Sequence, residues 1–288
     1  MNDKFHAIIQ KLIDQHQPES KEELQELLNS LVGQSIYDME LPDHEKTDAD
    51  KAQELVWEAY ELPIDKGRRR AKKALKLDPD CIAAHEYIGN TYQYYHKRGP
   101  HFEKGVEIGR RIFGGDFLKT NKGHFWGVTE TRPFMRCLGM LAECYYNPGQ
   151  TTKAIEIWKE MLELNPNDNQ GMRYNLLAAL LEQRDLKSYE KYRKEYDDED
   201  SSFFLFSDAL KAFIEEGDTT KSRQILRAAI GSNKYVVPIM TSEYPPEEYP
   251  DSYGWGNEDQ AIIYAHMAWR AWRRNDGARD WMKKYGRA

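Results

Sequence analysis

One stretch, residues 135–166, constrains the fold of this 288-residue chain more than any other. Apolar residues recur in it at helical spacing in two blocks, which the helix-breaking run Asn147-Pro148-Gly149 separates. Counted from Met135 as position 1, positions 4, 7, 8, 11, 20, 24, 27 and 32 hold Leu138, Leu141, Ala142, Tyr145, Ala154, Trp158, Met161 and Pro166. This spacing predicts two antiparallel helices, each with one apolar stripe, that approach closely at the small Ala142 and Ala154.

A single pair of such helices cannot bury both of its stripes, so further pairs must stack on it. The eight positions match the tetratricopeptide repeat, a helix-turn-helix unit of about 34 residues, and the stretch resembles that family. The resemblance implies an all-α fold, a right-handed solenoid of antiparallel helix pairs with helical caps. We expect many helices and no sheet, because helical stripes continue from Asp48 to Ile230 without two-residue alternation.

Breaks in the helical pattern divide the chain into four parts. Residues 1–32 are predicted to form two short amphipathic helices, either a cap or a small separate module, and residues 33–47 a linker. Tetratricopeptide-like repeats occupy residues 48–235 and contain a long insertion at residues 120–134. Residues 236–288 hold a segment rich in proline and aromatic residues, followed by C-terminal helices.

The repeat before the insertion is irregular. We expect a turn at residues 95–100, so that the second helix of this repeat begins late and directs Gly105, Gly109 and Ile112 toward the core. After the insertion, Thr131 is well placed to cap the next helix, because proline is tolerated in a first helical turn.

Four prolines between residues 236 and 256 argue against a helix there. The same segment carries four large aromatic residues, which are costly to leave in water: Tyr244, Tyr249, Tyr253 and Trp255. We therefore expect an extended, proline-stiffened strap that packs against the last helices.

Composition excludes several classes of function. The chain has 41 basic and 48 acidic residues, a net charge of −7, which gives no general attraction to nucleic acid or to anionic membranes. Three cysteines without Cys-x-x-Cys spacing predict neither a disulfide framework nor a zinc site. The first twenty residues lack a signal-peptide core and no run of 18 apolar residues occurs, so a cytoplasmic location is expected.

No motif of catalysis or cofactor binding is present. His96 and His101 lie five residues apart across the expected turn, a poor geometry for one metal ion. The glycine spacings fit no phosphate-binding loop, and no nucleophile motif of the Gly-x-Ser-x-Gly type occurs. We expect no catalytic residue, no metal and no cofactor.

A second resemblance covers about residues 131–281. It rests on Thr131-Arg132-Pro133-Phe134-Met135-Arg136, Asn175-Leu176-Leu177-x-Ala179-Leu180-Leu181-Glu182, Tyr196-Asp197-Asp198, Asp259-x-Ala261-Ile262-x-Tyr264-Ala265 and Gly277-Ala278. These residues resemble the C-terminal half of the suppressor of tumorigenicity seven family. The chain from about Asp50 is more similar still to uncharacterised bacterial repeat proteins. Both resemblances imply a repeat scaffold and supply no active site.

The candidate binding surface follows from the repeat geometry. Positions 2, 5, 9, 12 and 13 line the concave groove of this repeat class, and here they carry polar and charged residues. The insertion adds aromatic and charged residues beside the groove, as functional loops often do; an equal alternative is that it plugs a gap between imperfect repeats. The candidate partner-binding residues are Asn90, His124, Trp126, Glu130, Arg132, Arg136, Glu143, Gln170 and Arg173.

Three of these residues, Arg132, Arg136 and Arg173, set the expected chemistry. A guanidinium is a planar fork that suits a carboxylate. If acidic neighbours neutralise the three arginines, the groove is a salt-bridged wall; if not, it binds an acidic ligand. The second alternative is slightly favoured, with the Arg136→Ala/Arg173→Ala double variant expected to stay folded.

These observations predict a non-catalytic scaffold that binds a protein or peptide with an acidic segment or a free carboxylate. The alternative is an enzyme or small-ligand receptor with a pocket between the insertion at residues 120–134 and the groove. Self-association, for instance as a homodimer, is a third possibility.

Overall fold

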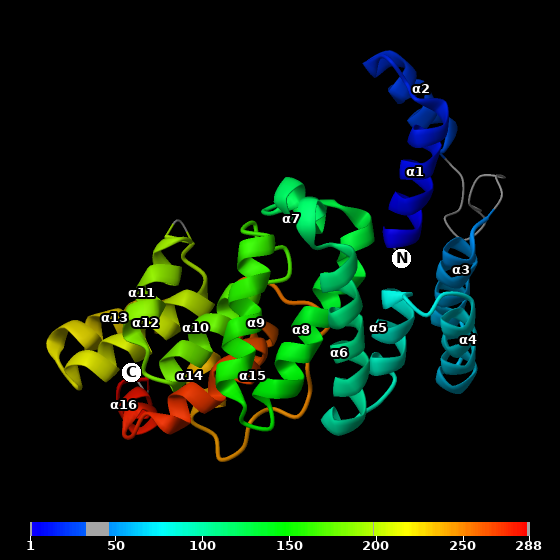
Figure 1. Cartoon of the computed structure of the whole chain (residues 1–288). Helices are drawn as coiled ribbons and strands as arrows, with labels where there is room; N and C mark the ends of the chain where they lie inside the picture. Colours follow the sequence, from blue (N-terminus) through cyan, green and yellow to red (C-terminus); the bar gives the residue numbers. More distant parts are fainter. Residues whose placement is uncertain (1, 33–45, 198, 287–288) are drawn as a thin grey trace. The chain divides into compact units, whose positions relative to one another are not determined.

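The computed structural model describes residues 2–32, 46–197 and 199–286, and in these ranges all of its regular secondary structure is helical (Figure 1). It contains sixteen α-helices, two short 3-10 helices and no strand there, which confirms the all-α prediction. Among the described helices, none combines the length and apolar character needed to cross a bilayer. Most of the predicted linker at residues 33–47 lies outside the described residues.

The chain divides into two compact units, which are described one at a time. The first comprises Met1–Gln150 with Glu163–Asn167, and the second Thr151–Leu162 with Asp168–Ala288. The division therefore passes between the two helices of the expected central repeat.

The first unit holds the chain up to the end of α8. Its helices are α1 (Asn2–His16), α2 (Lys21–Ser30), α3 (Asp48–Tyr60), α4 (Ile64–Leu77), α5 (Ile82–Asn90), α6 (Tyr95–Ile112), α7 (Gly115–Asn121), the 3-10 helices η1 (Phe125–Gly127) and η2 (Thr129–Thr131), and α8 (Arg132–Tyr146). From α3 onward each long helix packs on the next: α3 on α4, α4 on α5, α5 on α6 and α6 on α8. Alternate helices also touch, since α5 contacts both α3 and α8.

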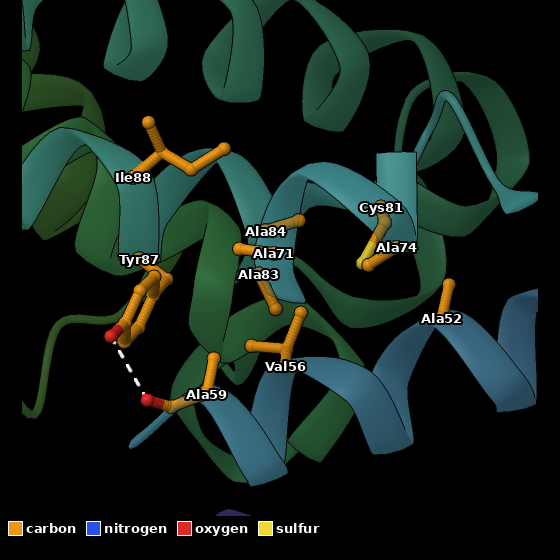
Figure 2. Packing of buried hydrophobic residues seen from close by; sticks show 10 residues of the cluster. All are labelled: Ala52, Val56, Ala59, Ala71, Ala74, Cys81, Ala83, Ala84, Tyr87 and Ile88. Carbon is orange, nitrogen blue, oxygen red and sulfur yellow. Dashed lines mark hydrogen bonds between the residues drawn. The ribbon is translucent and has the colours of Figure 1, made fainter. Parts of the chain in front are cut away.

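Small side chains allow α3, α4 and α5 to pack closely (Figure 2). Alanines and Val56 fill the space between the three helices, and the Tyr87 hydroxyl donates a 2.9 Å hydrogen bond to the Ala59 carbonyl. Gly67 makes room for this bond, because a Cβ atom there would lie 1.9 Å from the Tyr87 hydroxyl oxygen. Any larger residue at position 67 would displace the tyrosine.

The expected turn at residues 95–100 is instead the start of α6. The helix begins at Tyr95 and includes Pro100, which leaves only the His96 carbonyl without its usual helical donor. Gly105 and Gly109 are buried, as expected, whereas Ile112, also expected in the core, is 45% exposed and Ile108 is the buried isoleucine instead, at 1%. The prediction of a late second helix was therefore wrong.

The N-terminal helix pair packs within the first unit. Ile8 of α1 is buried against Phe5 and Leu12 of its own helix. It also contacts Leu31, which follows α2, and Trp57 of α3. The apolar stripe that the sequence predicts on α1 thus has a partner on α3.

The second unit holds the remaining helices. They are α9 (Thr151–Leu164, whose last two residues belong to the first unit), α10 (Met172–Glu182), α11 (Leu186–Lys194), α12 (Ser202–Glu216), α13 (Thr220–Ser232), α14 (Val236–Met240), α15 (Glu258–Arg274) and α16 (Ala278–Tyr285). Helix α10 packs on α11, α12 and α15, and α12 packs on α13, α15 and α16. A bond of 2.8 Å from the Trp272 indole to the Tyr264 hydroxyl satisfies two buried polar groups of α15.

The aromatic segment before α15 differs from the expectation in two ways. Its first residues form the short helix α14, and its aromatic side chains are not packed away: Tyr244 is 72% exposed, Tyr249 61% and Trp255 75%. Tyr253 does pack, edge-on, against Phe203 at 5.4 Å. The expected burial of the other three rings was wrong, although the centre of the Tyr249 ring lies 5.0 Å from that of His266 on α15.

Two tryptophans of the second unit provide a matched test of the core. Trp158→Ala should lower the free energy of unfolding by roughly 3–5 kcal/mol, the usual cost of removing a buried aromatic side chain, because Trp158 is 1% exposed. Trp255→Ala should change it by less than about 0.5 kcal/mol. Urea denaturation followed by circular dichroism measures both, and equal midpoints for the two variants would show that Trp158 is not a core residue.

Candidate functional site

Arg136 is held by a buried acid of the first unit. Its Nε and Nη2 atoms donate to the two carboxylate oxygens of Glu86 at 2.7 and 2.9 Å, a bidentate pair between α8 and α5. The Glu86 side chain is 5% exposed and that of Arg136 is 30% exposed. The guanidinium thus neutralises a buried carboxylate and joins two alternate helices.

Arg173 is likewise occupied, within the second unit. It contacts Asp168 at 2.9 Å and Glu199 at 2.9 Å, and its guanidinium lies 4.3 Å from the centre of the Tyr174 ring. Asp168 also accepts the backbone N–H groups of Met172 and Arg173, at 2.8 and 2.9 Å, and so caps the start of α10. The chain's own acidic residue Glu199 therefore takes the place expected for an acidic ligand.

Arg132 is directed toward the insertion. Its Nε donates to the Trp126 carbonyl at 3.0 Å, and its guanidinium lies 5.8 Å from the centre of the Trp126 ring. The His6 ring nitrogen of α1 is 3.4 Å from the same guanidinium. Of the other expected residues, His124, Glu130 and Asn90 are exposed.

The insertion fills space through Phe125, one of the aromatic residues that the sequence predicts beside the groove. This side chain is 1% exposed and meets the rings of Phe113, Phe117 and Phe134 at 5.8–6.3 Å. Thr131 precedes α8, as expected, but its hydroxyl makes no cap; it donates instead to the carbonyls of Phe125 and Val128. These contacts support the alternative that the insertion is a plug.

The nine candidate residues therefore do not form one described site. Arg132, Arg136, Glu143, Asn90 and the residues of the insertion belong to the first unit; Gln170 and Arg173 belong to the second. For Arg136 and Arg173, the alternative of arginines neutralised by acidic neighbours describes the structure.

A different arginine of the first unit, Arg98, forms no ion pair with any residue that the structure describes. It lies in the first turn of α6, where its Nη2 contacts the Met140 sulfur at 3.5 Å and its guanidinium lies 5.6 Å from the centre of the Phe102 ring. Its Nε is buried and has no hydrogen-bond partner among the described residues. A guanidinium without an ion-pair partner retains most of its capacity to bind an anion.

The charge of Arg98 acts on the carboxyl group of Glu143 in α8. Burial raises the pKa of Glu143, and Arg98 opposes that effect only in part. No ion pair within 4 Å joins the two side chains in the described structure. Tyr95 completes the cluster: burial and the charge of Glu143 raise its pKa. The sequence could have indicated Glu143, which is at groove position 9, but Arg98 fell in the expected turn.

Two histidines face each other near this cluster. His85 of α5 and His101 of α6 have ring centres 5.9 Å apart, and burial together with the charge of His101 lowers the pKa of His85 to about 4. In the described parts of the chain, no group of three His, Cys, Asp or Glu side chains is placed to hold a metal ion. The pair is thus a neutral, packed feature at physiological pH.

The second unit has a buried carboxylate of its own, Glu182. Its side chain has no exposed surface, accepts a hydrogen bond from Arg270 of α15 at 2.8 Å, and forms an ion pair with Arg274 of the same helix at 2.7 Å. Thr151 lies 3.4 Å from the same oxygen. This cluster ties α10 to α15 and to the start of α9.

A surface hollow of about 470 Å³ also lies in the second unit. Residues of α15, α16 and the start of the aromatic segment line it, among them Arg273, Arg279 and Glu243. Arg279 there donates to the carbonyls of Met240 and Ser242. The hollow is remote in sequence from the insertion, where a ligand pocket was expected as the alternative.

In comparisons with known proteins, no family model matches the chain, and no curated protein matches it.

The Glu86–Arg136 pair makes a prediction that differs from the sequence-based one. Arg136→Ala should lower the free energy of unfolding by about 3 kcal/mol, because it removes the guanidinium that neutralises a buried carboxylate; the partial exposure of Arg136 keeps the effect at the low end of the known range. Arg111→Ala is the control, since its pair with Asp80 is exposed and should contribute little. Urea denaturation of both variants measures this, and an unchanged midpoint for Arg136→Ala would contradict the structural role.

His85 should make the fold sensitive to acid. With a folded-state pKa of about 4 against an ordinary value of 6.5, His85 is neutral in both states above pH 6.5. As the pH falls from 6.5 to about 4 the unfolded chain takes up the proton first, so stability is lost across this window. His85→Gln should show a shallower loss in the same window when urea midpoints are measured at pH 7, 5.5 and 4. If the urea midpoints of the unaltered chain and of His85→Gln fall in parallel with pH, the pKa of His85 is not lowered in the folded state.

Proposed function

We propose that the chain is a non-catalytic scaffold that binds a protein or peptide bearing an acidic segment or a free carboxylate. The guanidinium of Arg98, which has no ion pair among the described residues and lies on α6 beside Met140 of α8, is the observation that carries this proposal. It takes the role that the sequence suggested for Arg136 and Arg173, both of which have acidic partners within the chain.

The packing order of the helices supports a tetratricopeptide-like solenoid as the framework. In the first unit, consecutive helices pack as pairs and alternate helices α3, α5 and α8 touch in succession. In the second unit, α10 touches both its neighbour α11 and the alternate helix α12. Stacked helix pairs produce this pattern of first- and second-neighbour contacts, and such arrays commonly use the exposed face of the alternate helices for binding.

The chemistry of the cluster around Arg98 suits a carboxylate. The guanidinium would donate to the ligand, while Glu143, whose burial raises its pKa, is readily protonated and can then donate as well. An incoming carboxylate would raise the pKa of Glu143 further, since like charges at short range disfavour ionisation. Binding should therefore strengthen as the pH is lowered and weaken with added salt.

A small-ligand pocket beside the insertion has less support. Phe125 packs into an aromatic cluster where such a pocket would open, and the Arg132 guanidinium faces the Trp126 ring. The peptide-binding scaffold remains the function that the described contacts favour.

The proposal can be tested with peptides selected on the full chain. We expect a random peptide library to yield ligands with acidic residues or a required C-terminal carboxylate, with affinities measured by fluorescence anisotropy. Arg98→Ala should weaken the free energy of peptide binding by about 1.5–3 kcal/mol, the contribution of a charged hydrogen bond. Glu143→Gln, which mimics the protonated acid, should retain the affinity.

Lys104→Ala is the matched control, because Lys104 is an exposed cation of the same helix paired with Glu107. It should leave the affinity unchanged. The proposal fails if Arg98→Ala binds the selected peptides as tightly as the unaltered chain does, or if amidated, neutral peptides bind equally well.

A further inference from the structure

The exposed aromatic side chains of the second unit form a feature separate from the Arg98 cluster. They belong to residues 241–257, which we call the aromatic strap. Tyr244, Tyr249 and Trp255 are 61–75% exposed. Large exposed rings of this kind are frequent anchors at interaction surfaces.

The strap is fixed along its length although these side chains are exposed. At its start, Arg279 donates to the Ser242 carbonyl, and the Ser242 hydroxyl donates to the Tyr244 carbonyl at 2.7 Å. At its middle, the His266 Nε2 atom bonds to the Glu248 carbonyl at 2.8 Å. At its end, the Gly256 N–H donates to the Gln260 side chain at 2.8 Å. The rings are therefore presented from an anchored backbone, which lowers the entropy lost on binding.

The charges of the strap have one sign. Residues 241–257 contain Glu243, Glu247, Glu248 and Asp251 and no lysine, arginine or histidine. Glu247, Glu248 and Asp251 are exposed and lie in sequence between Tyr244 and Trp255. The face of an aromatic ring carries negative potential as well, so rings and carboxylates attract the same kind of group.

We propose that the aromatic strap binds an arginine-bearing segment of a partner protein. A guanidinium can stack on an exposed ring and donate to a neighbouring carboxylate at the same time, because it is planar and has five N–H donors. A lysine ammonium makes the ion pair but stacks less well. The surface therefore fits arginine better than lysine, and it is independent of the carboxylate-binding face on the first unit.

A labelled twelve-residue peptide of alternating arginine and glycine serves as the probe for the full chain, with anisotropy as the readout. We expect it to bind more tightly than the matching lysine peptide, and the neutral citrulline peptide not to bind. Tyr244→Ala/Trp255→Ala should lower the affinity for the arginine peptide by about tenfold, the combined effect of two partly exposed cation–π contacts. The melting temperature of this variant should equal that of the unaltered chain, since both side chains are exposed.

Two control variants separate this surface from general charge attraction. Tyr60→Ala/Tyr94→Ala removes two exposed rings of the first unit, which are 55% and 62% exposed, and should leave binding unchanged. Glu247→Gln/Glu248→Gln should weaken binding, whereas Glu22→Gln/Glu26→Gln, with the same change in net charge on α2, should not.

Three results would overturn the proposal. The first is equal affinity for the arginine and lysine peptides together with no effect of Tyr244→Ala/Trp255→Ala, which would reveal charge attraction alone. The second is no binding of the arginine peptide at millimolar concentration. The third is concentration-dependent self-association that Lys72→Glu/Lys73→Glu abolishes, which would make the basic helix α4 of a second copy the occupant. Failure here leaves the Arg98 proposal untouched, because the probes carry opposite charge.

Discussion

The first unit depends on how closely α6 can approach the helices on either side of it. Glycines on α5 and α6 remove the side chains that would hold them apart: a Cβ on Gly89 would lie 2.6 Å from the Phe102 ring, and one on Gly109 would lie 2.1 Å from the Phe134 ring. The aromatic rings fill those spaces and are themselves buried. Because the contact needs both the glycine and the ring, the packing of α5, α6 and α8 is specified at a few positions rather than along whole stripes.

Buried carboxylates paired with arginines provide a second kind of tie in both units. Glu86 joins α5 to α8 through Arg136, and Glu182 joins α10 to α15 through Arg270. Such pairs add little net stability compared with apolar contacts, yet removing one partner is costly because the other charge stays buried. Arginines with these structural tasks are poor candidates for ligand binding. Arg98, which has no such partner, is the better candidate even though it lacks a place in the repeat pattern.

The helices themselves were predictable from the sequence to a large extent. Apolar periodicity located α8, α9, α10, α12 and α15 because it reflects only the geometry of a single helix and the need to bury one face. The prediction failed at α6, where Pro100 suggested a turn although a proline near a helix start removes only one hydrogen bond. It failed again at Tyr244, Tyr249 and Trp255, because the tendency of aromatic rings to be buried does not hold where the backbone is anchored on the surface.

The candidate site shows most clearly where local information ends. The sequence alone determined that the chain is helical, that it is acidic overall, and that arginines and aromatic residues occur at groove and insertion positions. Only the tertiary structure decided which charges are neutralised. Glu86 meets Arg136 across 50 residues of sequence and Glu199 meets Arg173 across 26. Ion pairing is a short-range interaction between side chains that packing brings together, so no spacing within one helix could reveal these partners.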